Sequence, residues 1–130
     1  MKIGELARRS DCLVETIRFY ERAGLLPPPE RAANNYRSYG QEHADRLAFI
    51  RHCRALDMTL DEIRALLALR DRPEQDCADV NALLDRHIDE VVQRIAALTA
   101  LDTQLRQLRS RCNSTDAVRC CAILNSLGTA

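Results

Sequence analysis

The sequence predicts an almost entirely helical (all-α) fold, with a compact N-terminal head that carries a small β-wing, one long helix and a short C-terminal loop. Three observations support this prediction. The 130-residue chain holds only four Gly and four Pro. Apolar residues recur three and four positions apart through most of its length, the spacing of an amphipathic helix. Residues 80–112 contain neither Pro nor Gly, so a single helix can run through them.

Composition limits the function classes. The chain is too short for a large catalytic domain, and no apolar run approaches membrane-spanning length, which predicts a cytoplasmic protein. In a reducing compartment, six cysteines favour thiolate metal sites over disulfides. Residues 1–54 carry a net charge of +3 and residues 55–130 a net charge of −3. The front half is therefore the candidate for nucleic-acid binding.

The first two helices are short. Ile3, Leu6 and Ala7 mark one face of a helix that should stop near Ser10, and a second helix packed through Ile17 should end at Gly24. Two short helices joined by a tight turn form a helix-turn-helix. From its second helix we expect these side chains to project: Glu15, Thr16, Arg18 and either Phe19 or Tyr20.

A small wing should follow. The run Leu25–Pro29 contains three prolines and cannot continue a helix. Residues 34–39 give a turn signal followed by alternating aromatic and polar residues, which predicts a β-wing presenting Arg37 beside Tyr36 and Tyr39. An arginine between aromatic residues is suited to holding a phosphate.

Two more helices should complete the head. A third is predicted over residues 41–56, with Leu47 on its inner side and either Ile50 or Arg51 beside it. The fourth begins with a capping box, because Thr59 is followed three residues later by Glu62.

The long helix needs a partner. Its apolar residues follow a heptad seam with one phase slip: Leu84, Ile88, Val91, Ile95, Leu98, then Leu101, Leu105, Leu108 and Cys112. At 1.5 Å per residue such a helix is roughly 50 Å long, more than the head can cover. Residues 113–130 are too few to bury the seam. We therefore expect an antiparallel coiled coil in a homodimer.

Four cysteines form a candidate metal site. Cys112 ends the long helix, a polar loop returns to Cys120 and Cys121, and Cys77 precedes the same helix. If two such helices run antiparallel, Cys77 of one subunit comes near Cys112 of the other, giving a three-thiolate site at the interface. Thiolates prefer soft or borderline ions. The alternative is that these cysteines are small apolar fillers, the role we assign to Cys12 and Cys53.

The order of these parts resembles the MerR family over nearly the whole chain. The resemblance is carried by these stretches: residues 3–7 (IGELA), 15–21 (ETIRFYE), 24–27 (GLLP) and 35–39 (NYRSY). It implies a transcription regulator that represses a heavy-metal resistance promoter without metal, and activates it by distorting the DNA when metal binds. Its partners would be promoter DNA and RNA polymerase. The residues expected at the DNA are Glu15, Thr16, Arg18, Tyr20, Tyr36, Arg37 and Tyr39.

Within the family, residues 57–64, 80–83 and 121–124 resemble the lead- and cadmium-responsive branch. This implies a site made by Cys77 of one subunit with Cys112 and Cys121 of the other. Cys120 is an alternative or additional ligand. The expected effector is Pb(II), then Cd(II), then Hg(II).

The expected division is a winged helix-turn-helix DNA-binding domain at 1–75, a dimerisation helix with its preceding cysteine at 76–112, and a metal-binding loop with a short terminal helix at 113–130. A mercury-responsive family member, a thiol-redox-sensing regulator and a cytosolic metal-buffering protein are alternative functions. An enzyme is not expected.

Overall fold

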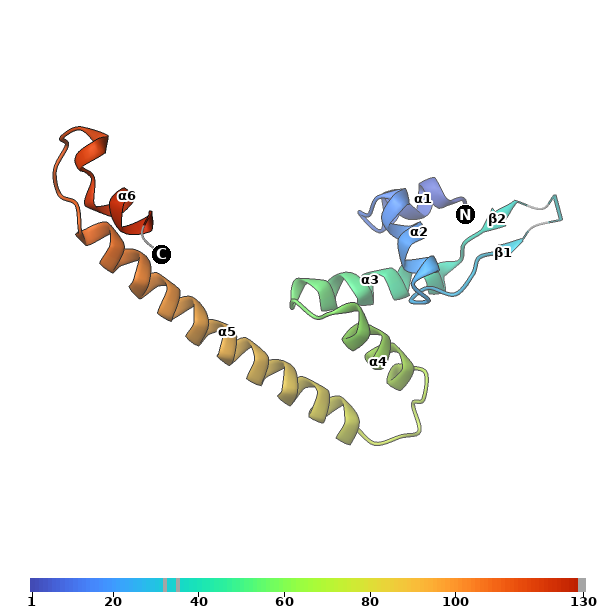
Figure 1. Ribbon diagram of the computed structural model, residues 1–130. Coiled ribbons are helices and arrows are strands. Elements are labelled where there is room, and N and C mark those ends of the chain that lie inside the picture. Colours follow the sequence, from blue (N-terminus) through green and yellow to red (C-terminus); the bar gives the residue numbers. More distant parts are fainter. Residues whose placement is uncertain (32, 35, 129–130) are drawn as a thin grey trace. The chain divides into compact units, whose positions relative to one another are not determined.

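The computed structural model describes residues 1–128 except positions 32 and 35, and the chain forms two compact units, Met1–Leu83 and Leu84–Ala130. It is mostly helical, as predicted (Figure 1). The elements in chain order are α1 (Ile3–Arg9), α2 (Val14–Arg22), β1 (Glu30–Arg31), β2 (Arg37–Ser38), α3 (Gln41–Ala55), α4 (Leu60–Arg70), α5 (Ala78–Ser110), the 3₁₀ helix η1 (Val118–Cys120) and α6 (Ala122–Leu127). Among the described residues, no helix has the length and apolar character needed to cross a membrane.

The predicted helix-turn-helix is present at α1 and α2. The two helices pack through Leu6 and Ile17, both fully buried. The turn between them passes through Asp11 with φ 49°, a left-handed conformation that Asp tolerates better than most residues. α2 ends as predicted: Gly24 has φ +77°, and Leu25 N–H donates to the Tyr20 carbonyl at 2.9 Å.

The wing is an antiparallel pair of two-residue strands. Glu30 lies opposite Ser38, and Arg31 lies opposite Arg37. Asn35, which falls in the predicted turn, lies outside the described residues. At the base of the wing, Tyr39 N–H donates to the Met1 carbonyl at 2.8 Å, and the Met1 nitrogen donates to the Tyr39 carbonyl at 2.7 Å. This pair of hydrogen bonds joins the start of the chain to the end of the wing.

Helices α3 and α4 complete the core of the head. α3 buries Leu47 and Ile50, whereas Arg51, the alternative inner residue, is exposed and donates to the Ser10 carbonyl at 2.8 Å. The capping box of α4 is confirmed, because Thr59 N–H donates to Glu62 Oε1 at 2.9 Å and Glu62 N–H donates to Thr59 Oγ1 at 3.1 Å.

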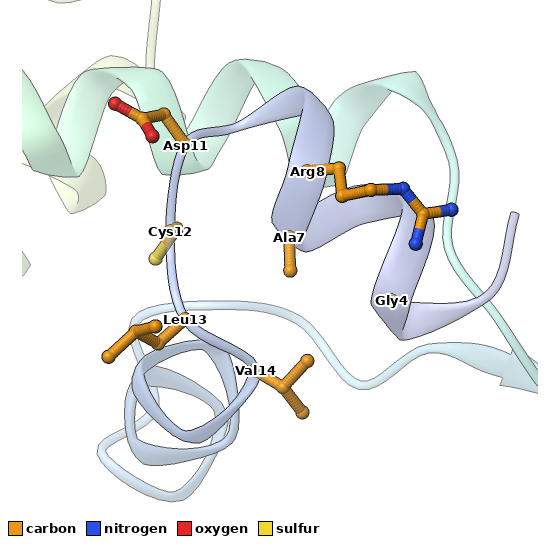
Figure 2. Close-up of a pocket in the computed structure, with 7 residues that line it drawn as sticks. All are labelled: Gly4, Ala7, Arg8, Asp11, Cys12, Leu13 and Val14. Carbon is orange, nitrogen blue, oxygen red and sulfur yellow. The ribbon is translucent and has the colours of Figure 1, made fainter.

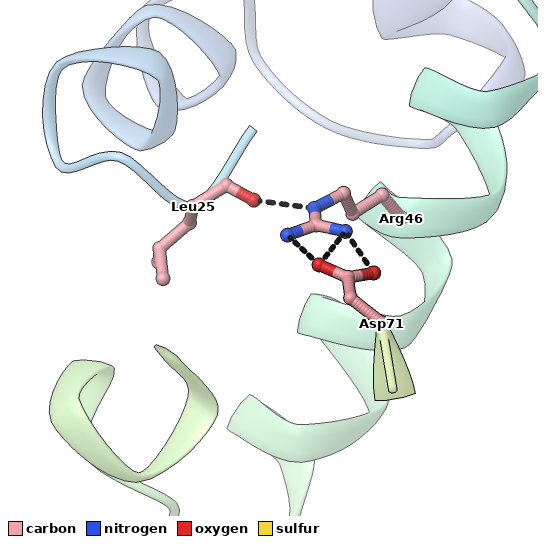
Figure 3. Close-up of polar contacts among 3 residues, drawn as sticks. All are labelled: Leu25, Arg46 and Asp71. Atoms are coloured by element: carbon pink, nitrogen blue, oxygen red, sulfur yellow. Dashed lines mark hydrogen bonds and ion pairs between the residues drawn. The ribbon is translucent and has the colours of Figure 1, made fainter. Parts of the chain in front are cut away.

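One arginine links three segments of the head. Arg46 of α3 donates from Nε to the Leu25 carbonyl at 2.8 Å, and its two terminal nitrogens lie 3.2–3.4 Å from the carboxylate of Asp71, the residue after α4 (Figure 3). The Arg46 guanidinium thus joins the middle of α3 to the segment after α2 and to the end of α4.

Helix α5 is 33 residues long and begins where Asp76 accepts a hydrogen bond from Ala78 N–H at 2.9 Å. Its first turns belong to the head, where Leu83 is buried. The prediction that it reaches Cys112 is wrong by two residues. The helix ends at Ser110. Beyond it, the Cys112 carbonyl accepts a hydrogen bond from Arg109 Nη1 at 2.6 Å, so a side chain of the last turn binds the chain that leaves the helix.

Candidate nucleic-acid interface and metal centre

The exposed side of α2 carries three of the predicted DNA-contacting residues. Glu15 and Arg18 are exposed and Thr16 is half-buried, while Ile17 packs inward as expected. Phe19 is also at the surface, with 44% of it exposed. These four residues place one carboxylate, one hydroxyl, one guanidinium and one aromatic ring on this side of the helix.

The prediction that Tyr20 projects from α2 is wrong. The residue is only 8% exposed and belongs to the hydrophobic core. Tyr20 follows Ile17 by three positions, which places both on the same helix face. The aromatic residue that α2 presents is Phe19, the other member of the pair considered from the sequence.

Tyr36 and Arg37 lie on the outside of the wing, with Tyr36 66% exposed. Tyr39 does not stand beside them as expected, because only 2% of it is exposed. Its ring meets His43 edge-on at 5.2 Å, and its hydroxyl donates to Glu21 Oε1 at 2.5 Å. Burial, together with the Glu21 carboxylate, raises the pKa of Tyr39 to about 12.

A cleft lined by arginines separates α2 from the wing. Arg18, Glu21, Arg22 and Arg37 line a hollow of about 440 Å³. An adjoining hollow of about 300 Å³ shares three of these residues and adds Arg31. The Glu21 carboxylate lies 3.8 Å from Arg37 Nη1. Guanidinium groups bind phosphate in a forked geometry, so this cleft suits a polyanion.

Sequence reasoning missed three residues of this cleft, Glu21, Arg22 and Arg31. Arg22 could have been found, because it follows Arg18 by four positions and so shares its helix face. Glu21 could have been found in the same way, because it follows Arg18 by three positions. Arg31 could not, because its part in the cleft depends on how the wing folds back beside α2.

A third hollow in the head lies beside the turn between α1 and α2. It measures about 430 Å³, and Figure 2 shows the residues that line it: Gly4, Ala7, Arg8, Asp11, Cys12, Leu13 and Val14. Cys12 is half-buried here, and burial is the main cause that raises its pKa. Its thiol therefore stays protonated, unlike a metal-binding thiolate.

Cys53 is a core residue, as expected, with burial raising its pKa as well. His43 is also buried. Its Nδ1 accepts a hydrogen bond from Gly40 N–H at 3.0 Å, and this fixes the ring at the start of α3.

The C-terminal loop begins at Cys112, whose thiol donates to the Ser114 carbonyl at 3.6 Å. Ser114 and Asp116 shape the next turn, because Asp116 N–H donates to Ser114 Oγ and that hydroxyl donates to the Asp116 carboxylate, both at 3.1 Å. The short helix η1 then leads to Cys121, which is the N-cap of α6.

The loop brings Cys112 and Cys121 together. The pKa of Cys121 is lowered, first by the backbone N–H of Leu124 and then by the N–H of Ile123 and the side chain of Cys112. Both cysteines are half-buried, whereas Cys120, on η1, is exposed. Two neighbouring sulfurs, one of them with a lowered pKa, are the type of donor that soft metal ions prefer.

Cys77 is exposed and lies one residue before α5, in the unit that contains the head. The 33 residues of α5 separate it along the chain from the cysteine loop. Its predicted meeting with the loop of a second subunit stays a prediction.

Comparison with known proteins agrees with this arrangement. The family model for "MerR HTH family regulatory protein" matches residues 1–69, and that for "MerR, DNA binding" matches residues 44–108. The chain is 48% identical to the HTH-type transcriptional regulator ZntR homolog of Haemophilus influenzae, over 89% of this chain and 86% of that protein. It is 39% identical to the mercuric resistance operon regulatory protein of Bacillus cereus, over 97% and 96%. Among solved structures, the transcription regulator PbrR691 from Ralstonia metallidurans CH34, in complex with lead(II), matches with a TM-score of 0.90 and 56% identity, over 98% of each chain.

Proposed function

The chain belongs to the MerR family of helix-turn-helix regulatory proteins, and from this premise we propose that it represses a heavy-metal resistance promoter as a homodimer and activates it when Pb(II), or Cd(II), binds. The family consists of DNA-binding regulators and not of enzymes. The observation that carries the metal part of the proposal is the pairing of Cys112 with Cys121.

Promoter DNA would lie against α2 and the wing. The cleft arginines provide the positive charge, and Glu15, Thr16 and Phe19 are the side chains of α2 placed to reach a groove. Arg18 and Arg37 would hold the phosphate backbone and fix the position of the head. Tyr36, exposed at the wing, would lie beside the same backbone. Tyr20 and Tyr39 would act through the core that they help to build.

The dimer is proposed from the apolar surface of α5. Ile88, Ile95 and Leu98 are 57–59% exposed on the seam predicted from the sequence. Side chains of this size on one helix face are stabilised by a partner helix. A second copy of α5, running antiparallel, would be this partner helix. Its Cys77 would lie near the C-terminal loop of this chain.

The proposed metal ligands are Cys112 and Cys121 of one subunit and Cys77 of the other. The lowered pKa of Cys121 favours the deprotonated sulfur that metal binding requires. Cys121 is preferred to Cys120 because it is the cysteine that contacts Cys112. Cys120, exposed one residue before it, is the alternative or a fourth ligand. A bound ion would form bonds with thiolates of both subunits and so link the two chains.

Pb(II) is proposed first because PbrR691, solved in complex with lead(II), is 56% identical over 98% of both chains. Cd(II) follows, because it also accepts three sulfur ligands. Hg(II) is the alternative within the same function, because the mercuric resistance operon regulatory protein of Bacillus cereus is 39% identical.

Activation would work through the DNA. Metal binding can activate transcription only if the three sulfurs come together in the same subunit arrangement that distorts the promoter DNA. The heads would then bend and untwist the DNA, so that RNA polymerase, a further proposed partner, finds its two promoter elements aligned.

A complementation experiment tests the shared site. Cys77→Ser and Cys112→Ser chains are each expected to lose thiolate-to-metal absorption with Pb(II). When the two are unfolded and refolded together, mixed dimers hold one intact ligand set and absorption returns. If mixing restores nothing while each variant still dimerises, the ligand set is not shared between subunits. Zn(II), Cd(II) and Hg(II) are titrated in parallel to rank the ions.

A promoter transcription assay tests the regulatory part, with single Ser variants of Cys77, Cys112, Cys120 and Cys121. Loss of the metal response on substitution of Cys121 but not of Cys120 supports the proposed ligand set. A response to oxidant alone, with Cys77 dispensable, would instead indicate a thiol-redox sensor that pairs Cys112 with Cys120 or Cys121. Metal binding without any selected DNA would indicate a metal-buffering protein.

A further inference from the structure

A single carboxylate on α2 holds two residues of the wing. Glu21 Oε1 accepts the hydroxyl of Tyr39 at 2.5 Å, and Glu21 Oε2 lies 3.8 Å from Arg37 Nη1. The Glu21 side chain is only 14% exposed. Both of its oxygens are therefore directed at the wing, across a separation of 16 to 18 residues in the sequence.

The two strands of the wing are short. Each strand has two residues, and an isolated two-stranded hairpin is marginally stable in water. The hydrogen bonds between Tyr39 and Met1 fix the backbone at the base of the wing. They do not fix the direction of the Arg37 side chain, which is 52% exposed.

An acidic residue in this place needs a reason. Glu21 lies in a cleft with Arg18, Arg22 and Arg37, where a carboxylate repels a phosphate group. Its charge by itself opposes DNA binding, so any favourable contribution of Glu21 must come from its other contacts. The two contacts with the wing are that contribution, because a guanidinium held in place loses less conformational entropy when it binds.

We propose that Glu21 is a positioning residue for DNA recognition: it holds Tyr39 and Arg37 so that Arg37 faces the same stretch of DNA backbone as Arg18 and Arg22. This inference rests on the proposed function. Tyr39 contributes from the buried side of the wing, because its ring packs against His43 and its hydroxyl donates to Glu21.

The consequence is selectivity for DNA shape. A wing fixed relative to α2 sets the spacing between two backbone contacts, and only DNA of matching groove width and bend satisfies both. A released Arg37 still attracts phosphate on any duplex. Loss of Glu21 should therefore weaken binding to the preferred sequence and should not weaken non-specific binding, for which only a charge that repels phosphate is removed.

The test uses the full chain and a duplex that the wild-type protein selects from a random pool, beside a scrambled duplex of the same composition. Glu21→Ala and Tyr39→Phe are each expected to weaken binding to the selected duplex by about tenfold, the worth of one charged hydrogen bond. Binding to the scrambled duplex should be unchanged for Tyr39→Phe and slightly stronger for Glu21→Ala, which loses a charge that repels phosphate. The double variant should be no weaker than Glu21→Ala alone, because that substitution already removes the contact with Tyr39. Amide hydrogen exchange at residues 36–38 should become faster in each.

The control is Glu42→Ala, which removes an exposed acidic residue from the first turn of α3 without touching the wing contacts. Stronger binding of both duplexes by Glu21→Ala, with no effect of Tyr39→Phe, would overturn the positioning role, because the loss of a repulsive charge alone would explain it. Equal weakening on both duplexes, with a lower melting temperature, would also overturn it. If the wild-type chain selects no duplex, the proposed function itself fails. The exchange measurement then still shows whether Glu21 orders the wing.

Discussion

Arg46 and Asp71 meet through three N···O contacts of 3.2–3.4 Å, while the same guanidinium donates to the carbonyl of Leu25 at 2.8 Å. The two interactions differ in environment. The Asp71 side chain is 56% exposed, so water and salt screen the ion pair, whereas the bond to Leu25 is partly buried. The arginine should therefore matter more to stability than the carboxylate does.

Arg46→Ala should lower the free energy of unfolding by about 1–2 kcal/mol, because it leaves the partly buried Leu25 carbonyl without its donor. Asp71→Asn removes only the exposed ion pair and should cost less than about 1 kcal/mol. Urea denaturation of the two variants measures the difference. Equal losses would mean that the ion pair, and not the carbonyl contact, joins the segments.

Gly24→Ala should destabilise the head by about 1–2 kcal/mol, because a side chain at a positive φ strains the backbone. The φ of Gly24 is +77°, and an added Cβ would meet no atom within 4 Å, so the cost is conformational and not a clash. Gly40→Ala is the matched control, since its φ of −110° suits any residue and the space around it is also open. A neutral Gly24→Ala variant would show that the turn can adjust.

Local signals explain which parts of the fold could be predicted. The capping box at Thr59 and the end of α2 at Gly24 each depend on residues within a few positions, and both were predicted from them. The end of α5 was not. Its apolar seam continues to Cys112, whereas the closing contact comes from the Arg109 side chain, which a periodic pattern does not reveal.

The candidate sites were less predictable because they depend on distant packing. Whether Phe19 or Tyr20 faced outward was left open by the pattern, and the core formed with Ile17 decided it. Tyr39 was expected on the wing surface because strand alternation suggested it. Its hydrogen bonds with Met1 and its contact with Glu21 turn it inward, and neither partner is close to it in sequence.

The six cysteines should differ in their rates of alkylation. Burial raises the pKa of Cys12 and Cys53, so few thiolates form there at neutral pH and both should react slowest with iodoacetamide. Cys121 has a lowered pKa and should react faster than Cys120 despite being less exposed. Mass spectrometry of timed digests measures each rate. Faster modification of Cys120 would mean that access, and not thiolate content, controls the loop.

A charge on the seam of α5 should weaken the proposed dimer. Ile95→Glu places two like charges in the proposed interface and should raise the dissociation constant by at least about tenfold. Gln93→Glu is the control, because this exposed residue lies on the opposite side of the helix from Leu84. Sedimentation velocity over a range of concentrations measures both variants. An unaffected Ile95→Glu dimer would place the interface elsewhere.

Tyr39 should make the head sensitive to alkali. Its pKa is raised from 10.0 to about 12 in the folded chain, so the folded state holds the phenolic proton more tightly than the unfolded state. The resulting stability is complete below pH 10 and is lost as the pH rises through 12. The free energy of unfolding should therefore fall across this interval by about 1.4 kcal/mol for each unit of pH. Tyr39→Phe, which has no such proton, should show a flatter profile over the same range, and Tyr36→Phe should keep the fall. Identical profiles for the wild-type and Tyr39→Phe chains would mean that the hydrogen bond from the Tyr39 hydroxyl to Glu21 does not stabilise the folded state. The contact between α2 and the wing would then be weaker than its 2.5 Å distance implies.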